Sequence, residues 1–422
     1  MPVPGLGPRP ARPRAGGGPP AALAVAAVAV VLAVALIVLA VVLVAAPAGV
    51  PGARGGHGRA DTAAAPDGLP HTTVEISPGH CGRGWRAPRP GLQVFDLHNT
   101  SDRAAEAYLE DPRSHAVHGE LEGIAPGTTR QLTVRLGKGA YAFRCVPDDS
   151  DAVTGPTVRV TSGVPGPAAA PVTEHDLVPP ALAYQKWVGA GLDTLVRLTG
   201  ALRAAIDRGD LAAARRAWLP AHLQYARLGA AYGAFGDAGE RIDGTDAGLP
   251  GGVRDPRFTG FHRLEYGLWH GRSAGALRAS AAALARDVGA LRDGWAQARV
   301  EPGQLGVRAH EILEDTVQFE LTGRTDYGSG SSLATARAHL DGTRAVLSRL
   351  RPLLATRYPQ LPRLEQEMDR ARRTLDALGA AGRPTPLARL TRRQREAVDA
   401  VFGDLVERLA PVAVLCDPRR TT

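Results

Sequence analysis

The chain has 422 residues, of which 44% are hydrophobic, so it is long and apolar enough to form more than one packed core. Its formal net charge is +8, but five arginines lie in residues 1–60, which contain no acidic residue, and the remainder carries +3. That small excess gives no reason to expect a nucleic-acid partner, because binding to phosphates requires concentrated positive charge.

The first segment with a clear structural preference is a run of 26 uncharged, mostly apolar residues at 21–46. It is long enough to cross a bilayer, and it follows Arg9, Arg12 and Arg14, as expected for positive charge on the cytoplasmic side. Residues 1–20 are therefore predicted to be a cytoplasmic basic N-terminus and residues 21–46 a transmembrane signal-anchor. A cleavable signal peptide is the alternative, although its apolar core is usually about 7–15 residues long. The protein is expected in the cell membrane as a single-pass protein, with the bulk of the chain extracytoplasmic.

The next segment, 47–71, is rich in Gly, Pro and Ala and is predicted to be a flexible linker. In residues 72–161, short apolar runs such as 93–97 and 140–145 alternate with Gly and Pro, which predicts a small β-sandwich. A proline-rich stretch at 162–173 is predicted to be a second linker.

Two of the three cysteines, Cys81 and Cys145, lie in the predicted sandwich, and Cys416 is close to the C-terminus. Outside the cytoplasm Cys81 and Cys145 have two uses: a disulfide, which an oxidising compartment favours, or thiolate ligands of a metal site. An electron-transfer copper centre is not indicated, since neither Cys-x-x-His nor a following Met occurs after Cys145.

Residues 174–415 consist of long Ala-, Leu- and Arg-rich segments with helical spacing, which predicts an all-helical bundle. Gly- and Pro-rich breaks separate the predicted helices. These are expected at 174–208, 210–236, 260–300, 303–322, 331–356, 360–380 and 390–412.

Within this bundle, Gly260-Phe261-His262-Arg263-Leu264-Glu265 places an imidazole and a carboxylate three residues apart, on one face of a helix. These side chains suit iron, zinc or manganese, and an interhelical ion pair is the non-metal alternative. A zinc peptidase would more usually contain His-Glu-x-x-His, which is absent, so no enzymatic activity is predicted. His222, which lies upstream, is interpreted as a packing histidine.

The stretch Phe258–Trp269 resembles the GxHxxE signature of the imelysin family, in particular of its EfeO-type members, which take part in iron uptake. The resemblance covers most of residues 72–410, and it implies a cupredoxin-like β-sandwich followed by an imelysin-type helical bundle that binds metal. The ligands that it implies are His262, Glu265, Asp243 and, in a later helix, Glu311 or Glu314. As an alternative to the disulfide, it implies a second metal site at Cys81, Cys145, Glu106 and Glu120.

The chain departs from the family pattern at Ala226, where a glutamate is common. The site is therefore expected to be weaker, rearranged around His222 or Asp237, or no longer selective for iron. Other uses of the implied ligands stay open: Asp243 can cap a loop, and the acids of 311–315 can form a solvated helix face.

The expected function is that of a membrane-tethered, extracytoplasmic protein that captures iron, ferrous or ferric, with copper or zinc as alternative ions. Its expected partners are an EfeU-like membrane iron permease and an EfeB-like haem peroxidase, and both follow from the resemblance alone. The alternatives are an imelysin-type metallopeptidase and a structural or polysaccharide-binding surface protein.

Overall fold

The computed structural model describes residues 67–379 and 385–420. The predicted cytoplasmic segment 1–20 and signal-anchor 21–46 lie outside the described residues, as does most of the predicted linker 47–71. Among the residues that are described, no helix combines the length and the apolar composition that crossing a bilayer requires.

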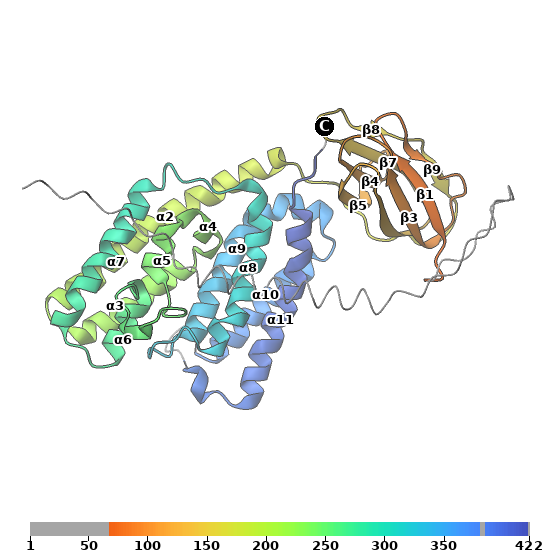
Figure 1. Cartoon of the computed structure of the whole chain (residues 1–422). Helices are drawn as coiled ribbons and strands as arrows, with labels where there is room; N and C mark the ends of the chain where they lie inside the picture. Colours follow the sequence, from red (N-terminus) through yellow and green to blue (C-terminus); the bar gives the residue numbers. More distant parts are fainter. Residues whose placement is uncertain (1–66, 380–384, 421–422) are drawn as a thin grey trace, which may run out of the picture. The chain divides into compact units, whose positions relative to one another are not determined.

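The first part of the described chain folds into two β-sheets (Figure 1). One sheet has the strand order β2-β1-β3-β6 and the other β5-β4-β7-β8, with β9 paired to β7. The strands are β1 (His71–Ile76), β2 (Cys81–Arg83), β3 (Gly91–Asn99), β4 (Ala105–Glu110), β5 (Val117–Ile124), β6 (Thr129–Leu136), β7 (Gly139–Pro147), β8 (Val153–Thr154) and β9 (Val158–Val160). Apolar side chains of both sheets, including Phe95 and Phe143, form one buried cluster, as in a sandwich. The cupredoxin-like character of this sandwich stays a prediction.

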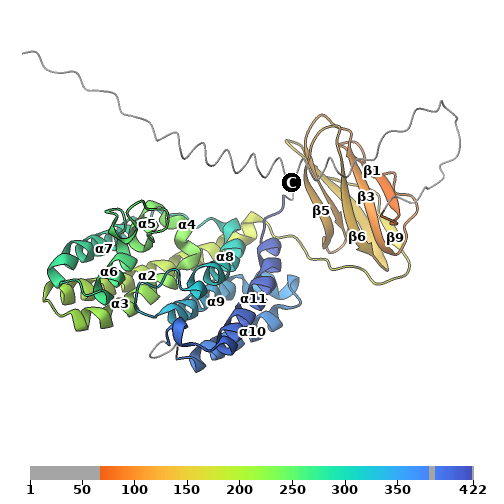
Figure 2. The ribbon, with the colours of Figure 1, turned by 60° about the horizontal axis from the view of Figure 1, so that its bottom comes forward.

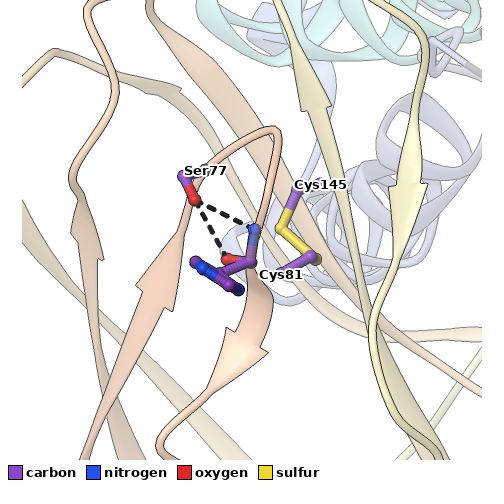
Figure 3. The surroundings of a disulfide bond; sticks show 4 residues. Ser77, Cys81 and Cys145 are labelled. Carbon is purple, nitrogen blue, oxygen red and sulfur yellow. Dashed lines mark hydrogen bonds between the residues drawn. A yellow bond between two sulfur atoms is a disulfide. The ribbon is translucent and has the colours of Figure 1, made fainter.

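A disulfide joins the two sheets, because Cys81 lies on β2 and Cys145 on β7 (Figure 3). Their Cα atoms are 5.8 Å apart, and both side chains are buried. In the turn before Cys81, the Ser77 hydroxyl accepts a hydrogen bond from the His80 amide at 3.0 Å. Of the two uses that the sequence left open for these cysteines, the structure contains the disulfide.

The second part is entirely helical, so the order of a sheet region followed by helices is the one predicted. The helices are α2 (Glu174–Asp207), α3 (Leu211–Ala226), α4 (Tyr232–Phe235), α5 (Asp237–Asp243), α6 (Gly260–Trp269), α7 (Ala274–Gly294), α8 (Leu305–Gln318), α9 (Ser332–Arg357), α10 (Leu361–Ala377) and α11 (Arg392–Leu415), with short 3-10 turns between some of them. Leucine, valine and aromatic side chains from these helices share one buried core.

The single helix predicted at 260–300 is wrong, because α6 and α7 are separate helices. Gly271 has φ +73°, a left-handed conformation that ends α6, and Ser273 then caps α7 by accepting from the Ala276 amide. α6 is consequently only ten residues long. It lies beside α3 and α5 in both views of the ribbon (Figures 1 and 2).

Candidate metal centre

A close approach of two chain segments places α5 against the start of α6. Gly260, the first residue of α6, has φ +73°, and a Cβ built on it would lie 2.1 Å from the Ile242 carbonyl oxygen. Only glycine allows both this backbone conformation and this contact. The Thr259 hydroxyl donates to the Arg241 carbonyl at 3.0 Å and strengthens the junction. As a result, the last residue of α5, Asp243, lies beside the first turn of α6, which carries His262.

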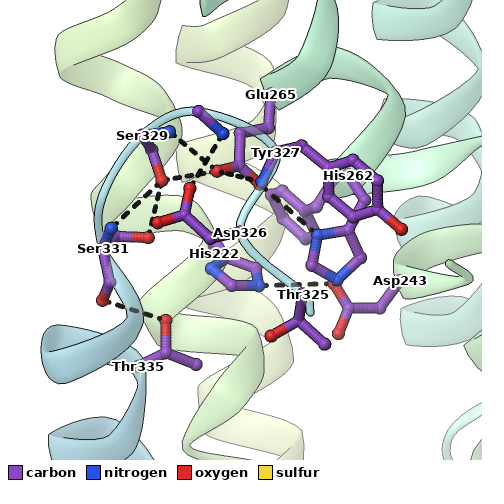
Figure 4. Close-up of polar contacts among 12 residues, drawn as sticks. His222, Asp243, His262, Glu265, Thr325, Asp326, Tyr327, Ser329, Ser331 and Thr335 are labelled. Carbon is purple, nitrogen blue, oxygen red and sulfur yellow. Dashed lines mark hydrogen bonds and ion pairs between the residues drawn. The ribbon is translucent and has the colours of Figure 1, made fainter. Parts of the chain in front are cut away.

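Three metal-compatible donors converge at this junction (Figure 4). The Nε2 atoms of His222 and His262 lie 3.4 and 3.6 Å from the same oxygen, Oδ1 of Asp243. One donor atom from each of the three residues lies within 4.8 Å of the other two. Bonds of about 2.0–2.2 Å to a tetrahedral ion place neighbouring donors about 3.3–3.6 Å apart. The two histidine-to-aspartate separations therefore match the edges of a coordination polyhedron.

His222 is held in place by its apolar neighbours. Its ring stacks on that of Trp218, one turn earlier on α3, with centroids 4.8 Å apart. Trp218 is itself fixed, since its Nε1 donates to the Phe261 carbonyl at 2.9 Å. His222 is 4% exposed, and its Nδ1 has no hydrogen-bond partner among the described residues. The ring therefore directs its Nε2 toward Asp243.

Glu265 contacts His262 on the side of the imidazole ring that faces away from Asp243. Its Oε2 is 3.4 Å from Nδ1 of His262, the ring nitrogen opposite the one that faces Asp243. Its Oε1 accepts three hydrogen bonds, from the amides of Tyr327 and Ser329 at 3.1 and 3.0 Å and from the Ser329 hydroxyl at 2.5 Å. A carboxylate on the far nitrogen of a ligand imidazole fixes its orientation and increases its basicity. In this structure Glu265 orients His262 and is not one of the three converging donors.

The donors lie in the wall of a cavity of about 580 Å³. The exposed residues Phe319 and Arg324 also line it, and they mark the side that faces solvent. Deeper in the wall are Glu320, which is 7% exposed and accepts from the Thr325 hydroxyl at 2.6 Å, and His339. The cavity leaves room beside a bound ion for water or another ligand.

The charges of the cluster are strongly coupled. Burial alone would lower the pKa of His262, but the neighbouring carboxylates of Asp243 and Glu265 raise it to about 9. Burial also opposes ionisation of Asp243 and Glu265, yet the imidazoles beside them hold the pKa of both carboxyls below the usual range. By contrast, burial raises the pKa of Glu320 and lowers that of His339 to about 4. Asp243 and Glu265 are therefore ionised at neutral pH and are balanced by the cationic imidazole of His262.

The other acids that the sequence suggested as ligands lie elsewhere. Glu311 pairs with Arg308 at 2.6 Å, and Glu314 accepts from Gln318 at 3.0 Å; neither lines the cavity. The acid of this helix that lines the cavity is Asp315. The structure therefore brings Asp243 and His262 together with His222, and Glu311 and Glu314 are not among the residues that line the cavity.

The alternative metal site in the sandwich is not formed in this structure. Its two cysteines are joined in the disulfide, so they offer no thiolate. Glu106 accepts a hydrogen bond from the Tyr108 hydroxyl, and Glu120 accepts from Nε of Arg419 at 2.9 Å. The donor set that the resemblance implied there is occupied by other contacts.

Sequence reasoning underrated His222, which it named only as an alternative centre of a rearranged site, and missed Glu320. The interpretation of His222 as a packing histidine is incomplete, because the ring packs on Trp218 and also faces Asp243. The missing glutamate at position 226 was the signal for that alternative, since residue 222 precedes it by one turn on the same helix face. Glu320 follows α8 in a 3-10 turn, and no motif marked it.

Comparison with known proteins identifies the family of the chain. The family model described as Imelysin, whose short name is that of a peptidase group, matches residues 181–412. A protein of Yersinia pestis named "Iron uptake system component EfeO" is 29% identical over 326 residues, which cover 76% of this chain and 84% of that protein. Proteins with the same name from Yersinia pseudotuberculosis and Escherichia coli K12 are 28% and 27% identical over 81% and 69% of this chain, and over 90% and 77% of their own lengths. The chain belongs to the imelysin family and is similar to its EfeO members.

Proposed function

We propose that this protein is the metal-capturing component of an iron uptake system. Iron binds at His222, Asp243 and His262, and the protein delivers it to a membrane permease. The observation that carries the proposal is the convergence of two imidazoles and a carboxylate on one wall of a cavity. The names of the similar proteins, which are iron uptake components, support iron as the ion, with zinc and copper as alternatives.

The placement of the protein outside the cytoplasm is part of the proposal. The Cys81–Cys145 disulfide supports it, because structural disulfides persist mainly in oxidising compartments. Residues 21–46 are proposed as the single-pass anchor that tethers the protein to the membrane. An EfeU-like permease is the proposed recipient of the iron, and an EfeB-like haem peroxidase is a proposed companion.

The protein is proposed to bind metal without catalysing hydrolysis. A metallopeptidase needs a general base beside the metal-bound water, within hydrogen-bond reach of it. Glu265 is the acid that the sequence motif offers for that role, but its carboxylate is engaged by His262, Tyr327 and Ser329. A binding role uses this arrangement directly, since Glu265 then fixes the ligand imidazole.

The test is metal analysis of the purified full-length protein after anaerobic titration with ferrous iron. We expect one tightly bound ion per chain. In the near-isosteric double variant Asp243→Asn, His262→Gln, we expect affinity to fall by at least about 100-fold, which corresponds to about 2.7 kcal/mol. Glu311→Gln is the matched control, because it removes a predicted ligand that lies outside the cavity. Retention of stoichiometric iron by a folded double variant overturns the proposal.

Delivery is tested separately, by iron uptake in cells that contain the permease. The double variant is expected to abolish uptake, and Glu311→Gln to leave it unchanged. Uptake at the wild-type rate with the double variant contradicts the delivery role, even where metal binding in solution is confirmed.

A further inference from the structure

We infer that the Tyr327 hydroxyl is a latch on the cavity, which sets how fast an ion enters and leaves without binding the ion itself. Tyr327 lies on the loop of residues 323–331, and its hydroxyl joins this loop to the one between α5 and α6. The inference rests on the proposed function, because it concerns the rate at which the captured ion exchanges.

The Tyr327 hydroxyl connects two segments that are 81 residues apart in the sequence. It donates to Oδ1 of Asp246 at 2.6 Å and accepts from the Asp246 amide at 3.1 Å. Among the residues that the structure describes, these two hydrogen bonds are the ones that tie residues 245–249 to a distant part of the chain. Removal of a single oxygen atom therefore releases this stretch from its partner loop.

Both loops line the solvent-facing side of the cavity. Asp246 and Ala247 line it from one loop, and Arg324 and Tyr327 from the other. Ala247 and Arg324 are exposed, whereas Tyr327 is 9% exposed. A Cβ built on Gly248 would meet no atom within 4 Å, so packing does not hold this part of the first loop. The bonds between Tyr327 and Asp246 thus join the two sides of the rim, which can separate when these bonds break.

The remainder of Tyr327 is held by residues of the candidate metal centre. Its amide donates to Oε1 of Glu265 at 3.1 Å, and its ring lies against the imidazole of His262, with centroids 5.1 Å apart (Figure 4). The ring also contacts that of Phe258, with centroids 5.2 Å apart. These contacts do not involve the hydroxyl, so its removal leaves His262 and Glu265 in place.

The position of the latch determines its effect on binding. Neither Tyr327 nor Asp246 is one of the three converging donors, so their hydrogen bonds can form whether or not an ion is held. Loss of these bonds makes local opening of the rim more frequent in both forms. More frequent opening raises the rates of association and release by the same factor and leaves the dissociation constant unchanged.

The test compares the exchange kinetics of wild-type and Tyr327→Phe full-length protein under argon. Association with ferrous ammonium sulfate is followed by stopped-flow fluorescence, for which Trp218 beside His222 is a natural reporter. Release is followed by the absorbance of the ferrous complex of ferrozine, which is added in fixed excess. In the variant we expect both rates to rise by about tenfold, the factor for loss of one hydrogen bond to a charged group, and the dissociation constant to equal that of wild type.

Tyr232→Phe is the matched control. It removes a tyrosine hydroxyl from the wall of the same cavity, but that hydroxyl donates to the Tyr225 carbonyl at 3.2 Å and joins neither loop. We expect wild-type rates in this variant. Asp246→Asn controls for charge, because it keeps an oxygen that accepts from Tyr327, and its rates should stay closer to wild type than those of Tyr327→Phe.

Asp246→Ala breaks the latch from the other loop. We expect faster exchange, and the double variant Tyr327→Phe, Asp246→Ala should exchange no faster than Tyr327→Phe, since both substitutions act on the same contact. Hydrogen exchange of the protein without added metal is an independent readout. Residues 244–249 should exchange faster in Tyr327→Phe, because the Asp246 amide loses its acceptor, and at the wild-type rate in Tyr232→Phe.

The outcomes separate this inference from the proposed function. Wild type that binds no ferrous iron overturns the proposed function and, with it, the role of the latch in exchange. Where wild type binds the ion, unchanged rates in Tyr327→Phe, or unchanged hydrogen exchange of residues 244–249, overturn the latch alone. Faster release with unchanged association and weaker binding also overturns it, because the hydroxyl would then position the ligands instead of holding the rim.

Discussion

The two carboxylates beside His262 hold its imidazole in the protonated form. With a pKa raised to about 9 by Asp243 and Glu265 against the effect of burial, its imidazole is cationic in the metal-free protein at neutral pH. The pKa values of the two carboxyls are lowered, so these groups stay ionised over the same range. Under the proposed function, metal binding would release the proton of His262, so affinity would weaken as the pH falls below 9.

We predict that the dissociation constant rises about tenfold for each pH unit below 9, the value for release of one proton. The measurement is calorimetric titration with zinc at pH 6, 7 and 8, in pairs of buffers that differ in protonation enthalpy. The buffer difference gives the number of protons released. Affinity that does not change between pH 6 and 8 would contradict the assignment of His262 as a ligand.

Glu265 offers a second prediction at the residue scale, because its two oxygens have different partners. Oε2 faces His262, and Oε1 accepts hydrogen bonds from Tyr327 and Ser329. Glu265→Gln keeps an oxygen that accepts from Tyr327 and Ser329 but removes the charge beside His262. We expect metal affinity to fall by about 10–100-fold, as for other groups that form a hydrogen bond to a metal-ligating side chain. Thermal unfolding should change little in this variant.

Glu265→Ala is the contrasting variant. It leaves the amides of Tyr327 and Ser329 buried without an acceptor, at about 1–3 kcal/mol for each group. We expect it to lower both metal affinity and the free energy of unfolding, measured by urea denaturation. Equal metal affinity in wild type and Glu265→Gln would show that the charge of Glu265 does not act on the site.

The sequence identified site residues only where their spacing along one helix was informative. His262 and Glu265 were found because a helix places them on one face. Spacing could not assign one to the ion and the other to its support, since that depends on loop 325–331, which is far away in sequence. His222 was underrated for the same reason: its partner Asp243 belongs to a different helix.

At the scale of elements, the junction of α5 and α6 depends on one backbone contact. Gly260→Ala is predicted to force the helices apart, because the new Cβ would overlap the Ile242 carbonyl oxygen, 2.1 Å away. We expect loss of metal binding and destabilisation by more than about 2 kcal/mol, since left-handed strain alone costs about 1–2 kcal/mol. Urea denaturation and zinc titration measure the two effects.

Gly271→Ala is a closely matched control for that substitution. Gly271 has the same φ, +73°, but a Cβ built there meets no atom within 4 Å. The Gly271→Ala variant should therefore be destabilised only by left-handed backbone strain and should keep wild-type metal affinity. Equal effects of the two substitutions would mean that the close approach of α5 and α6 does not set the geometry of the site.

Helical periodicity predicted the existence of most helices but not which acids reach the cavity. On α8 the buried positions Leu305, Ala309, Ile312 and Thr316 follow a helical repeat, and Glu311 and Glu314 fall outside it. That repeat excludes Asp315 as well, although Asp315 lines the cavity, so the pattern of buried positions does not identify the acid that reaches it. The break between α6 and α7 depends on the left-handed Gly271, a conformation that a single glycine in the sequence permits but does not impose.

At the scale of the whole molecule, the disulfide and the metal cluster are predicted to act independently. The Cys81–Cys145 link spans 64 residues, and its loss is expected to destabilise the protein by about 4 kcal/mol through the entropy of the unfolded chain. The double variant Cys81→Ser, Cys145→Ser should unfold at lower temperature in calorimetry. Its metal stoichiometry and affinity should equal those of wild type, and a lost equivalent of metal would indicate a second site in the sandwich.

The large-scale order of the chain, a sheet region followed by a helical region, was predictable because periodicity changes from strand-like to helical near residue 174. The pairing of Cys81 with Cys145 was one of two options, since spacing does not distinguish a disulfide from a thiolate pair. The membrane anchor stays a prediction, because residues 21–46 lie outside the described part of the chain.

Under the proposed function, the cavity beside the cluster has a consequence for how an ion would be passed on. His222, Asp243 and His262 would hold the ion from the wall of a space of about 580 Å³. A donor atom of the recipient could then bond to the ion before any bond to the protein breaks. Transfer would follow associative ligand exchange, with a rate that increases with recipient concentration, and the ion would not pass through a free aquo state.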